Sequence, residues 1–283
     1  MYNAEQDVSE NINMLKRQTY ENFHCVLVDD ISTDRSVEMA IDAVAGDARF
    51  SVIRNQEKKY KVRNVVEALS FIEPSDEDVI LIVDGDDKLA SDDVLQTLQQ
   101  IYQQKNALLT YGSYMDANGQ RSVICQQYAE RIIEKNRFRK AKWHASHLKT
   151  FKFKLFKKIR REDLTISSAE LTATVNKALL RGRFKAWYQW RKIKLAELLE
   201  PSGQYIRRMD DKVLFYPMLE MAGDRGLFIE DILYVYSGQY VKDTVTAQKV
   251  KIIPGDHKSK WYGRLIRQVL QNKPAYSRLS PEF

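Results

Sequence analysis

The sequence contains little cysteine and no long hydrophobic run. Its 283 residues include only two cysteines, Cys25 and Cys125, which excludes a disulfide framework and fits a reducing compartment. No apolar stretch approaches the ~20 residues that a membrane-spanning helix needs, and no secretory signal follows Met1. A Gly-rich phosphate-binding loop is also missing. We therefore expect a cytoplasmic protein that neither spans a membrane nor depends on disulfides.

Charge is distributed unevenly along the chain. Residues 1–100 carry 10 Lys and Arg against 21 Asp and Glu, whereas the remainder carries 35 against 17, which gives a net charge of +7. Residues 135–161 hold twelve Lys and Arg and no acid. Such a run suits phosphates, anionic lipid or nucleic acid. It equally suits a solvated surface that complements the acidic part of the chain.

The first half alternates helix and strand patterns. Apolar runs predict strands at 23–29, 50–54, 79–84 and 107–111, and helical spacing predicts helices at 8–15, 36–45, 62–72 and 95–104. This alternation predicts an α/β fold with βαβ units and a mostly parallel sheet flanked by helices. A turn at 116–119 marks a change of architecture.

The second half is less regular and is expected to be helical or mixed. We expect a long basic helical segment at 171–199 that Gly182 interrupts, a helix at 212–222 that Pro217 kinks or breaks, a strand at 229–236 and a short helix at 262–270. The domain prediction is a binding half at 1–115, a second half at 116–245 with an insertion at about 171–208, and a basic tail at 246–283.

The most informative stretch is "VILIVDGDDK", residues 79–88. Its continuous apolar run predicts a strand covered on both faces, and the run stops at Asp84, Asp86 and Asp87. Carboxylates at the end of a buried strand need a positive partner. A hard divalent cation prefers oxygen ligands and often shares them with phosphates. Because ligands bind at the carboxyl ends of such strands, a cation-phosphate site is predicted here.

A second acidic pair ends another predicted strand, in "LVDDISTDRS". Helix capping explains the serine and threonine of this stretch, but it does not explain Asp29 and Asp30 together. Carboxylates at this position can accept hydrogen bonds from a nucleobase or ribose. Two such clusters on consecutive units, with a basic loop at 58–64 between them, indicate one binding edge.

These motifs together resemble a family-2 glycosyltransferase of GT-A fold. The resemblance rests on "MYNAEQDVSENINMLKRQTYENFHCVLVDDISTDRS", then "NQEKKYKVRN", then "VILIVDGDD". The first stretch contains the Y-N-x-E of the family's usual P-x-Y-N-x-E opening and its V-D-D-x-S-T-D motif, and the last contains its D-x-D motif. A narrower match, in "KWHASHLKTFKFKLFKKI", "DDKVLFYPMLEMAG" and "ILYVYS", resembles the acceptor half of a bacterial or viral subgroup.

The resemblance implies a GT-A, Rossmann-like fold and metal-dependent transfer of a sugar with inversion. The donor would be a nucleotide-sugar, with a UDP-sugar favoured, and the acceptor a glycan or lipid-linked saccharide of surface polysaccharide or glycoconjugate synthesis. Asp84 and Asp86 would hold Mn²⁺ or Mg²⁺. The residues that would bind the nucleotide-sugar are Tyr2, Asn3, Asp29, Asp30, Arg63, Asn64, Asp84 and Asp86.

The acceptor side is expected to supply a general base. The resemblance assigns it to Asp211, with its neighbour Asp210 as the alternative. Four further residues are expected near the acceptor or the diphosphate, namely Trp143, His147, Lys149 and Lys152. For Trp143 and His147, packing in the core is the competing interpretation.

The chain departs from the family pattern in two places. Family members carry an apolar strand before Tyr-Asn, in the middle of the sheet, where this sequence begins at Met1; we expect unpaired strand edges there, and a misassigned start or truncated gene as the cause. The insertion at 171–208 interleaves Trp187, Tyr188 and Trp190 with cations. That composition suits an anionic membrane surface and a peripheral location on its inner face, or aromatic packing on the core.

Two other functions remain as alternatives. A nucleotidyltransferase also needs a Rossmann-like sheet with metal-binding acids, although the missing Gly-rich loop argues against it. A catalytically impaired basic module that binds lipid or nucleic acid would explain the run at 135–161, although the acids at 84–87 argue against it. Nucleic acid is not favoured as a partner.

Overall fold

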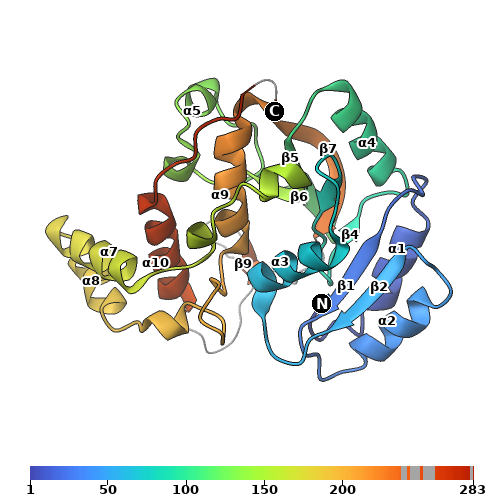
Figure 1. Ribbon diagram of the computed structural model, residues 1–283, viewed down its shortest axis with the longest axis horizontal. Coiled ribbons are helices and arrows are strands. Elements are labelled where there is room, and N and C mark those ends of the chain that lie inside the picture. The colour runs from blue at the N-terminus through green and yellow to red at the C-terminus, as the bar shows by residue number, and fades with distance from the viewer. Residues whose placement is uncertain (237–240, 243–248, 251–258, 281–282) are drawn as a thin grey trace.

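The computed structural model describes residues 1–236, 241–242, 249–250, 259–280 and 283 (Figure 1). The first half contains α1 (Val8–Lys16), β1 (Cys25–Asp29), α2 (Ser36–Val44), β2 (Phe50–Arg54), α3 (Tyr60–Ile72), β3 (Val79–Leu81), β4 (Lys88–Leu89), α4 (Val94–Gln104) and β5 (Leu109–Asp116). The second half contains α5 (Glu130–Glu134), β6 (Ser146–Lys152), α6 (Phe153–Phe156), α7 (Ser168–Leu180), α8 (Phe184–Trp190), α9 (Asp210–Ala222), β7 (Gly226–Tyr236), β8 (Val241–Lys242), β9 (Lys249–Val250) and α10 (Ser259–Asn272). Short 3-10 turns lie at Phe138–Lys140, Arg161–Leu164, Leu195–Glu197 and Gly223–Arg225.

The strands form two main sheets. β1 and β2 make a two-stranded parallel sheet, and the five-stranded sheet has the order β3-β6-β5-β7-β4. Within the larger sheet β5 and β7 are parallel, whereas β6 runs antiparallel to both neighbours and β4 runs antiparallel to β7. The expected α/β fold is confirmed, but the larger sheet is mixed rather than mostly parallel. Strand β6 lies between β3 and β5 and runs opposite to both, and the edge strand β4 runs opposite to β7.

The observed elements correct two boundaries and settle the continuity of one helix. β3 stops at Leu81, before the expected end at residue 84, and it pairs along one edge only, with β6. β5 extends to Asp116. α9 continues through Pro217 without a break, and residues 212–222 are all buried. Burial of residues 212–222 therefore offsets the hydrogen bond that the proline cannot donate.

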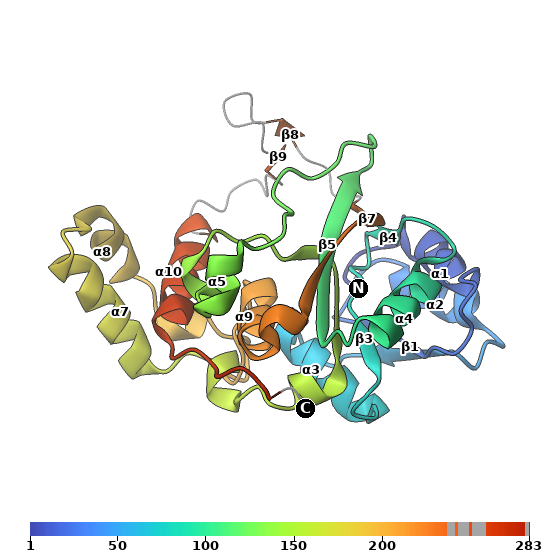
Figure 2. The same cartoon turned by 90° about the horizontal axis from the view of Figure 1, so that it is seen from above.

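The buried apolar residues form two clusters. One buried apolar cluster surrounds α9, α10, β5 and β6, and the other lies among α1, α4 and β7. Helix α10 buries Tyr262, Leu265 and Val269, so this part of the expected basic tail is a packed helix; the expected boundary at 245–246 and residues 251–258 lie outside the described residues. Helices α7 and α8 project on the side opposite β1 and β2 (Figures 1 and 2).

The sequence predicts that no segment spans a membrane. Among the described residues, no helix has both the length and the apolar character that crossing a membrane requires.

Candidate active site

The loop after β3 carries the three clustered aspartates and is held by α1. The side-chain amide of Asn11 donates to the carbonyl oxygens of Asp87 at 2.8 Å and of Asp84 and Gly85 at 3.3 Å each. A Cβ at Gly85 would lie 2.9 Å from the Cβ of Met1, closer than real Cβ atoms approach. Glycine is therefore needed where the N-terminal residue crosses this loop.

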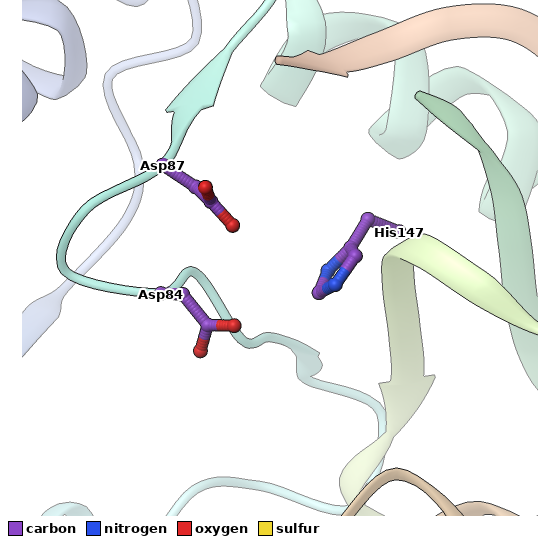
Figure 3. Close-up of side chains that lie close together, drawn as sticks. All are labelled: Asp84, Asp87 and His147. Carbon is purple, nitrogen blue, oxygen red and sulfur yellow. The ribbon is translucent and has the colours of Figure 1, made fainter. Parts of the chain in front are cut away.

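Asp84, Asp87 and His147 converge in front of this loop. One ligand atom from each side chain lies within 4.8 Å of those of the other two, and Figure 3 shows the two carboxylates and the imidazole pointing toward one another. Tyr234 of β7 fixes the arrangement: its ring stacks on His147 at 4.6 Å, and its hydroxyl donates to Asp87 at 2.9 Å and accepts from the Asp84 N–H at 3.2 Å.

The chemistry of these three donors fits a divalent cation. Burial, with a further contribution from Lys149, lowers the pKa of His147 to about 3, so its imidazole is neutral at physiological pH and able to ligate. Its Nδ1 is buried and has no hydrogen-bond partner among the described residues. Two carboxylates and one imidazole together offer oxygen and nitrogen ligands to such a cation.

The predicted metal pair was Asp84 and Asp86. Asp84 lies in the cluster together with Asp87, and Asp86 is half-buried in the same loop. The role of Asp86 as a metal ligand stays a prediction. Asp87 could have been singled out from the sequence, because it belongs to the same acidic run. The sequence gave no indication that Tyr234 lies at the site, because it is one of several apolar residues of the predicted strand at 229–236.

Two lysines balance the acids on the opposite side. The Lys61 ammonium of α3 pairs with Asp84 and lies 3.4 Å from a carboxylate oxygen of Asp210. The Lys149 ammonium of β6 pairs with Asp211. Burial alone would lower the pKa of Lys61, but the nearby Asp210 and Asp84 charges raise it above its ordinary value. Lys149 was predicted to lie near the acceptor or the diphosphate, whereas Lys61 was noted only as part of the basic loop at 58–64.

Asp210 and Asp211 occupy the first turn of α9, where the helix dipole favours negative charge. Met209 takes the N-cap position with φ 63°, so neither aspartate caps the helix. Burial and repulsion from Asp211 raise the pKa of Asp210 despite the opposing Lys61 charge. Burial would also raise the pKa of Asp211, but the nearby cations, chiefly Lys149 and Lys61, together outweigh it and lower this pKa. The two side chains are 28% and 36% exposed, so both remain accessible.

Asp30 binds the loop that leads into α3. It accepts hydrogen bonds from the N–H groups of Lys59 at 2.8 Å and Tyr60 at 3.1 Å and from the Asn55 amide at 3.0 Å. The Lys58 ammonium lies 3.3 Å away. Burial would raise the pKa of Asp30, but these hydrogen bonds and the Lys58 charge lower it. Asp30 therefore shapes the rim of the site through the backbone that it holds.

Asp29 and Asn3 join the N-terminal loop to the turn after β1. The Ser32 hydroxyl donates to Asp29 at 2.5 Å and accepts from the Asn3 N–H at 2.9 Å. The Asn3 side-chain oxygen accepts from the Thr33 N–H at 2.9 Å. Both residues thus hold two chain segments together at the predicted binding edge.

The remaining predicted nucleotide residues differ in accessibility. Tyr2 is 54% exposed, with the Lys58 ammonium 3.1 Å from its ring centroid. Asn64 accepts from Asn55 at 2.8 Å. Arg63 instead forms ion pairs with three carboxylates, those of Glu57, Glu67 and Glu200. The structure therefore gives Arg63 a bracing role between α3 and the segment before α9.

Trp143 and Lys152 contact residues outside the cluster of Asp84, Asp87 and His147, and Lys152 lines the cavity described below. Trp143 packs edge-on against Tyr216 at 5.2 Å, with the Lys212 ammonium 4.6 Å from its ring. Lys152 is the last residue of β6, five positions beyond His147, and pairs with Glu77 at 2.6 Å. At ~3.4 Å per residue, the strand separates Lys152 from the cluster.

A cavity of about 1430 Å³ opens beside the cluster. Six of the predicted nucleotide-sugar residues line it, namely Tyr2, Asn3, Asp30, Asn64, Asp84 and Asp86. Lys61 lines it as well. The acidic motifs that follow β1 and β3 thus line one cavity, as expected if both strands end at the same edge of the molecule.

Half of the twelve cations in the basic run at 135–161 form ion pairs within the described part of the molecule. At least six of its cations form ion pairs, namely Arg139, Lys149, Lys152, Lys154, Lys157 and Arg160. This observation favours the interpretation that the run complements acidic side chains of the same chain, and it weakens the lipid-binding or nucleic-acid-binding alternative.

Comparison with known proteins places these features in a family. The family model described as glycosyl transferase family 2 matches residues 1–164. The glycosyltransferase GlyG of Streptococcus pneumoniae serotype 4 is 31% identical over 114 residues, which cover 40% of this chain and 36% of GlyG. The uncharacterized glycosyltransferase EpsJ of Bacillus subtilis is 29% identical over 166 residues, which cover 58% of this chain and 46% of EpsJ. The matched stretch thus spans less than half the length of these relatives.

Solved structures share the fold at low sequence identity. Staphylococcus aureus TarS superimposes with a TM-score of 0.54 at 16% identity, over 84% of this chain and 35% of that chain. A structure of TarS 1–349 in complex with UDP gives a TM-score of 0.51 at 17% identity, over 84% of this chain and 58% of that chain. The α/β architecture is therefore that of GT-A glycosyltransferases.

Proposed function

Because the chain belongs to glycosyl transferase family 2, we propose that it transfers a sugar from a nucleotide-sugar to a saccharide acceptor, with inversion and with the aid of a divalent metal. The observation that carries the proposal is the convergence of Asp84, Asp87 and His147 beside Asp210 and Asp211. A UDP-sugar is the favoured donor, since a neighbour of the same fold was solved with UDP.

The nucleotide would lie in the cavity beside β1. The exposed ring of Tyr2 offers a face for stacking on a base, and the side chains of Asn3 and Asn64 offer amide groups for ribose or base edges. Asp29 and Asp30 would act mainly by holding the loops that carry these groups, because their oxygens already accept hydrogen bonds from those loops.

The donor diphosphate would meet the acidic cluster and its lysines. Asp84, Asp87 and His147 would hold Mn²⁺ or Mg²⁺, which supplies charge stabilisation to the departing nucleoside diphosphate. Lys61 and Lys149 would share this task, because each already faces the site with a buried or half-buried ammonium group.

Asp211 is our assignment for the general base that takes the proton of the acceptor hydroxyl. It is the more exposed of the two aspartates, and Lys149 keeps it ionised in the protein without donor. A bound diphosphate would attract Lys149 and thereby raise the basicity of Asp211. Asp210 would stay with Lys61 on the metal side.

A donor panel tests the proposal. The protein is incubated with UDP-, GDP- and dTDP-sugars and Mn²⁺, and nucleoside diphosphate release is measured with and without EDTA. Release should depend on the metal and vanish in Asp87→Ala, whereas Asp42→Ala, which changes an exposed aspartate of α2, should behave as the unaltered protein. Pyrophosphate release would instead identify a nucleotidyltransferase, and lack of turnover with every donor would contradict the transferase.

We further propose that the enzyme is cytoplasmic and lies peripherally on the inner face of the membrane, where lipid-linked saccharides would be its acceptors. The α7–α8 arm supports this proposal: Leu180 is 86% exposed, Phe184 65% and Tyr188 46%. Residues 171–196 around them contain seven Lys and Arg and no acid. Exposed apolar side chains within a basic surface suit an anionic interface, while the buried Trp190 anchors the arm to the core.

Liposome flotation tests the membrane proposal. The protein should float with vesicles that contain anionic lipid and less with zwitterionic vesicles. The double variant Leu180→Ser, Phe184→Ser should lose flotation, whereas Phe71→Ser, which changes an exposed phenylalanine of α3, should retain it. Equal flotation of the arm variant and the unaltered protein would reject the membrane role.

A further inference from the structure

Lys212 of α9 is a buried cation without a counter-ion in the described part of the chain. The buried cations among the described residues are Arg139, Lys149, Lys212 and Lys273. The first two and the last pair with carboxylates, whereas the Lys212 ammonium forms no ion pair or hydrogen bond with a described residue. Charged side chains are rarely buried without a partner. The charge of Lys212 therefore remains for a ligand to balance.

The Lys212 ammonium lies over an aromatic ring. Its Nζ is 4.6 Å from the centroid of the Trp143 ring. Trp143 also packs edge-on against Tyr216, one turn further along α9, at 5.2 Å. An aromatic face attracts a cation, but it accepts no hydrogen bond of the strength that a carboxylate or phosphate oxygen does. Trp143 is only partly buried, so its ring also offers an apolar surface on which a sugar can pack.

Other cations act on the same position. Burial lowers the pKa of Lys212 to about 8, and Asp211 opposes this effect. Arg267 of α10 and Lys149 of β6 add to the lowering, which shows that their charges reach the Lys212 amine. Arg267 is exposed and forms no ion pair with a described residue. The amine is still mainly protonated at pH 7, so an anion beside it would meet a positive potential.

The position of Lys212 next to Asp211 limits what this anion can be. The two residues are consecutive in α9, and their Cα atoms are ~3.8 Å apart. Asp211 is our assignment for the base that takes the proton of the acceptor hydroxyl, and its side chain is 36% exposed. A negative group that reaches Lys212 therefore belongs to the sugar unit that carries this hydroxyl or to the next unit along the acceptor.

We propose that Lys212, Trp143 and Arg267 form a subsite for an acidic saccharide acceptor. A carboxylate or phosphate group of the acceptor pairs with the Lys212 ammonium, and a sugar ring lies against Trp143. The inference rests on the proposed transferase function and adds the chemical class of its acceptor. The buried charge, which destabilises the protein while it is unpaired, gains its partner when the acceptor binds. Lys212 thereby selects acidic over neutral acceptors.

Binding of small sugars tests the subsite without donor or metal. Glucuronate and glucose 6-phosphate supply the two kinds of acidic group, glucose is the neutral control, and ligand-observed NMR titration measures each Kd. At least one of the acids should bind about tenfold more tightly than glucose or better, and the tighter of the two identifies the acidic group. Lys212→Met should weaken binding of that acid by about 10–100-fold, because it removes a hydrogen bond to a charged group.

Two further variants make the test independent of how Lys212→Met folds. Arg267→Met changes only an exposed side chain and should weaken binding of the acid by about two- to fivefold, since an exposed charge contributes less. Lys105→Met, at the exposed lysine that follows α4, is the matched control and should bind the acid as the unaltered protein does. Circular dichroism checks that all three variants are folded.

Three results would overturn the subsite. The first is that neither acid binds more tightly than glucose, and the second is that the preference for the acid survives in Lys212→Met and Arg267→Met. The third is that Lys212→Met weakens binding of UDP with Mn²⁺ as much as binding of the acid, since the lysine would then serve the donor. The sugar titrations involve no turnover, so their failure is separable from failure of the proposed transferase in the donor panel.

Discussion

At the scale of single residues, the site depends on how Tyr234 orders two of its neighbours. Its ring lies on His147, and its hydroxyl is bonded to Asp87. Loss of a partner that orients a metal ligand typically weakens metal binding by about 10–100-fold. The hydroxyl of Tyr234 and the stacking of its ring can be separated experimentally, since phenylalanine keeps the ring alone.

Tyr234→Phe should therefore weaken Mn²⁺ binding by about 10–100-fold while the fold is retained. Titration calorimetry at pH 7 measures the affinity, and circular dichroism checks the fold. Tyr111→Phe is the matched control, because Tyr111 is equally buried in β5 and its hydroxyl accepts from the Tyr128 N–H instead. Unchanged affinity in Tyr234→Phe would show that this hydroxyl does not position the ligands.

Substitutions of the two neighbouring aspartates of α9 should reduce kcat to different extents. Asp211→Asn should reduce kcat by about 10²–10⁴-fold with little change in the KM for donor, because the general base acts in the chemical step. Asp210→Asn should retain more of kcat, since Asp210 pairs with Lys61 on the donor side. The reverse ranking in steady-state kinetics would assign the base to Asp210.

Lys212 makes stability depend on pH. It is 7% exposed, and burial lowers its pKa to about 8, opposed by Asp211. Because the unfolded value is ~10.4, the unfolded chain binds more protons than the folded chain between about pH 8 and pH 10.4, and stability rises with pH in this window. Below about pH 8 both states carry the proton, so the full cost of burying the charge remains.

Lys212→Met should remove this cost and stabilise the protein at pH 7 by about 1–3 kcal/mol. The gain should shrink as pH approaches 10, since the unaltered lysine is then neutral in the folded state. Urea denaturation at pH 7.0 and 9.5 measures both effects, and Lys142→Met, at an exposed lysine, should change neither value. A gain that does not depend on pH would point to improved packing alone.

At the scale of secondary-structure elements, a buried ion pair fastens α9 to the C-terminal part of the chain. Arg139 donates to Glu220 at 2.7 Å and 3.0 Å and to the Leu270 carbonyl at 2.9 Å. Glu220 also accepts from the Tyr276 N–H at 3.1 Å. Arg139 and Glu220 are 3% and 0% exposed, so neither charge can turn to solvent if its partner is removed.

Arg139→Met should lower the free energy of unfolding by about 3–5 kcal/mol, because it leaves a buried carboxylate without its cation. The double variant Arg139→Met, Glu220→Met should recover most of this loss, since two apolar side chains need no partner. Urea denaturation of the single and double variants measures both free energies of unfolding. A single variant that loses less than about 1 kcal/mol would mean that water reaches Glu220.

Element by element, the sequence predicted local structure better than pairing. The helices at 36–45, 62–72 and 95–104 and the strands at 23–29 and 50–54 are confirmed within two residues, because periodicity and β-propensity are local properties. Strand direction was not predicted, since β6 finds its place between β3 and β5 through residues distant in the chain. Likewise, the helix across Pro217 persists because of burial that no local pattern reveals.

At the scale of the whole molecule, the site gathers parts of the chain that are far apart in sequence. The acidic loop follows β3, His147 and Lys149 come from β6, Lys61 from α3, and the aspartate pair from α9. Lys61 links the acidic loop to α9, because it contacts both Asp84 and Asp210, the neighbour of the proposed base. The N-terminal residue lies at the same edge, between β1 and the acidic loop.

The sequence by itself determined the α/β alternation, the family, and the two acidic motifs at one edge of the sheet, because these depend on residue type and spacing along the chain. The tertiary structure decided which side chains meet. It brought Asp87 and His147 to Asp84, added Lys61 and Tyr234, and paired Lys152 with Glu77. The direction of a side chain in a loop and the approach of distant strands follow from packing in three dimensions, which spacing in one dimension does not encode.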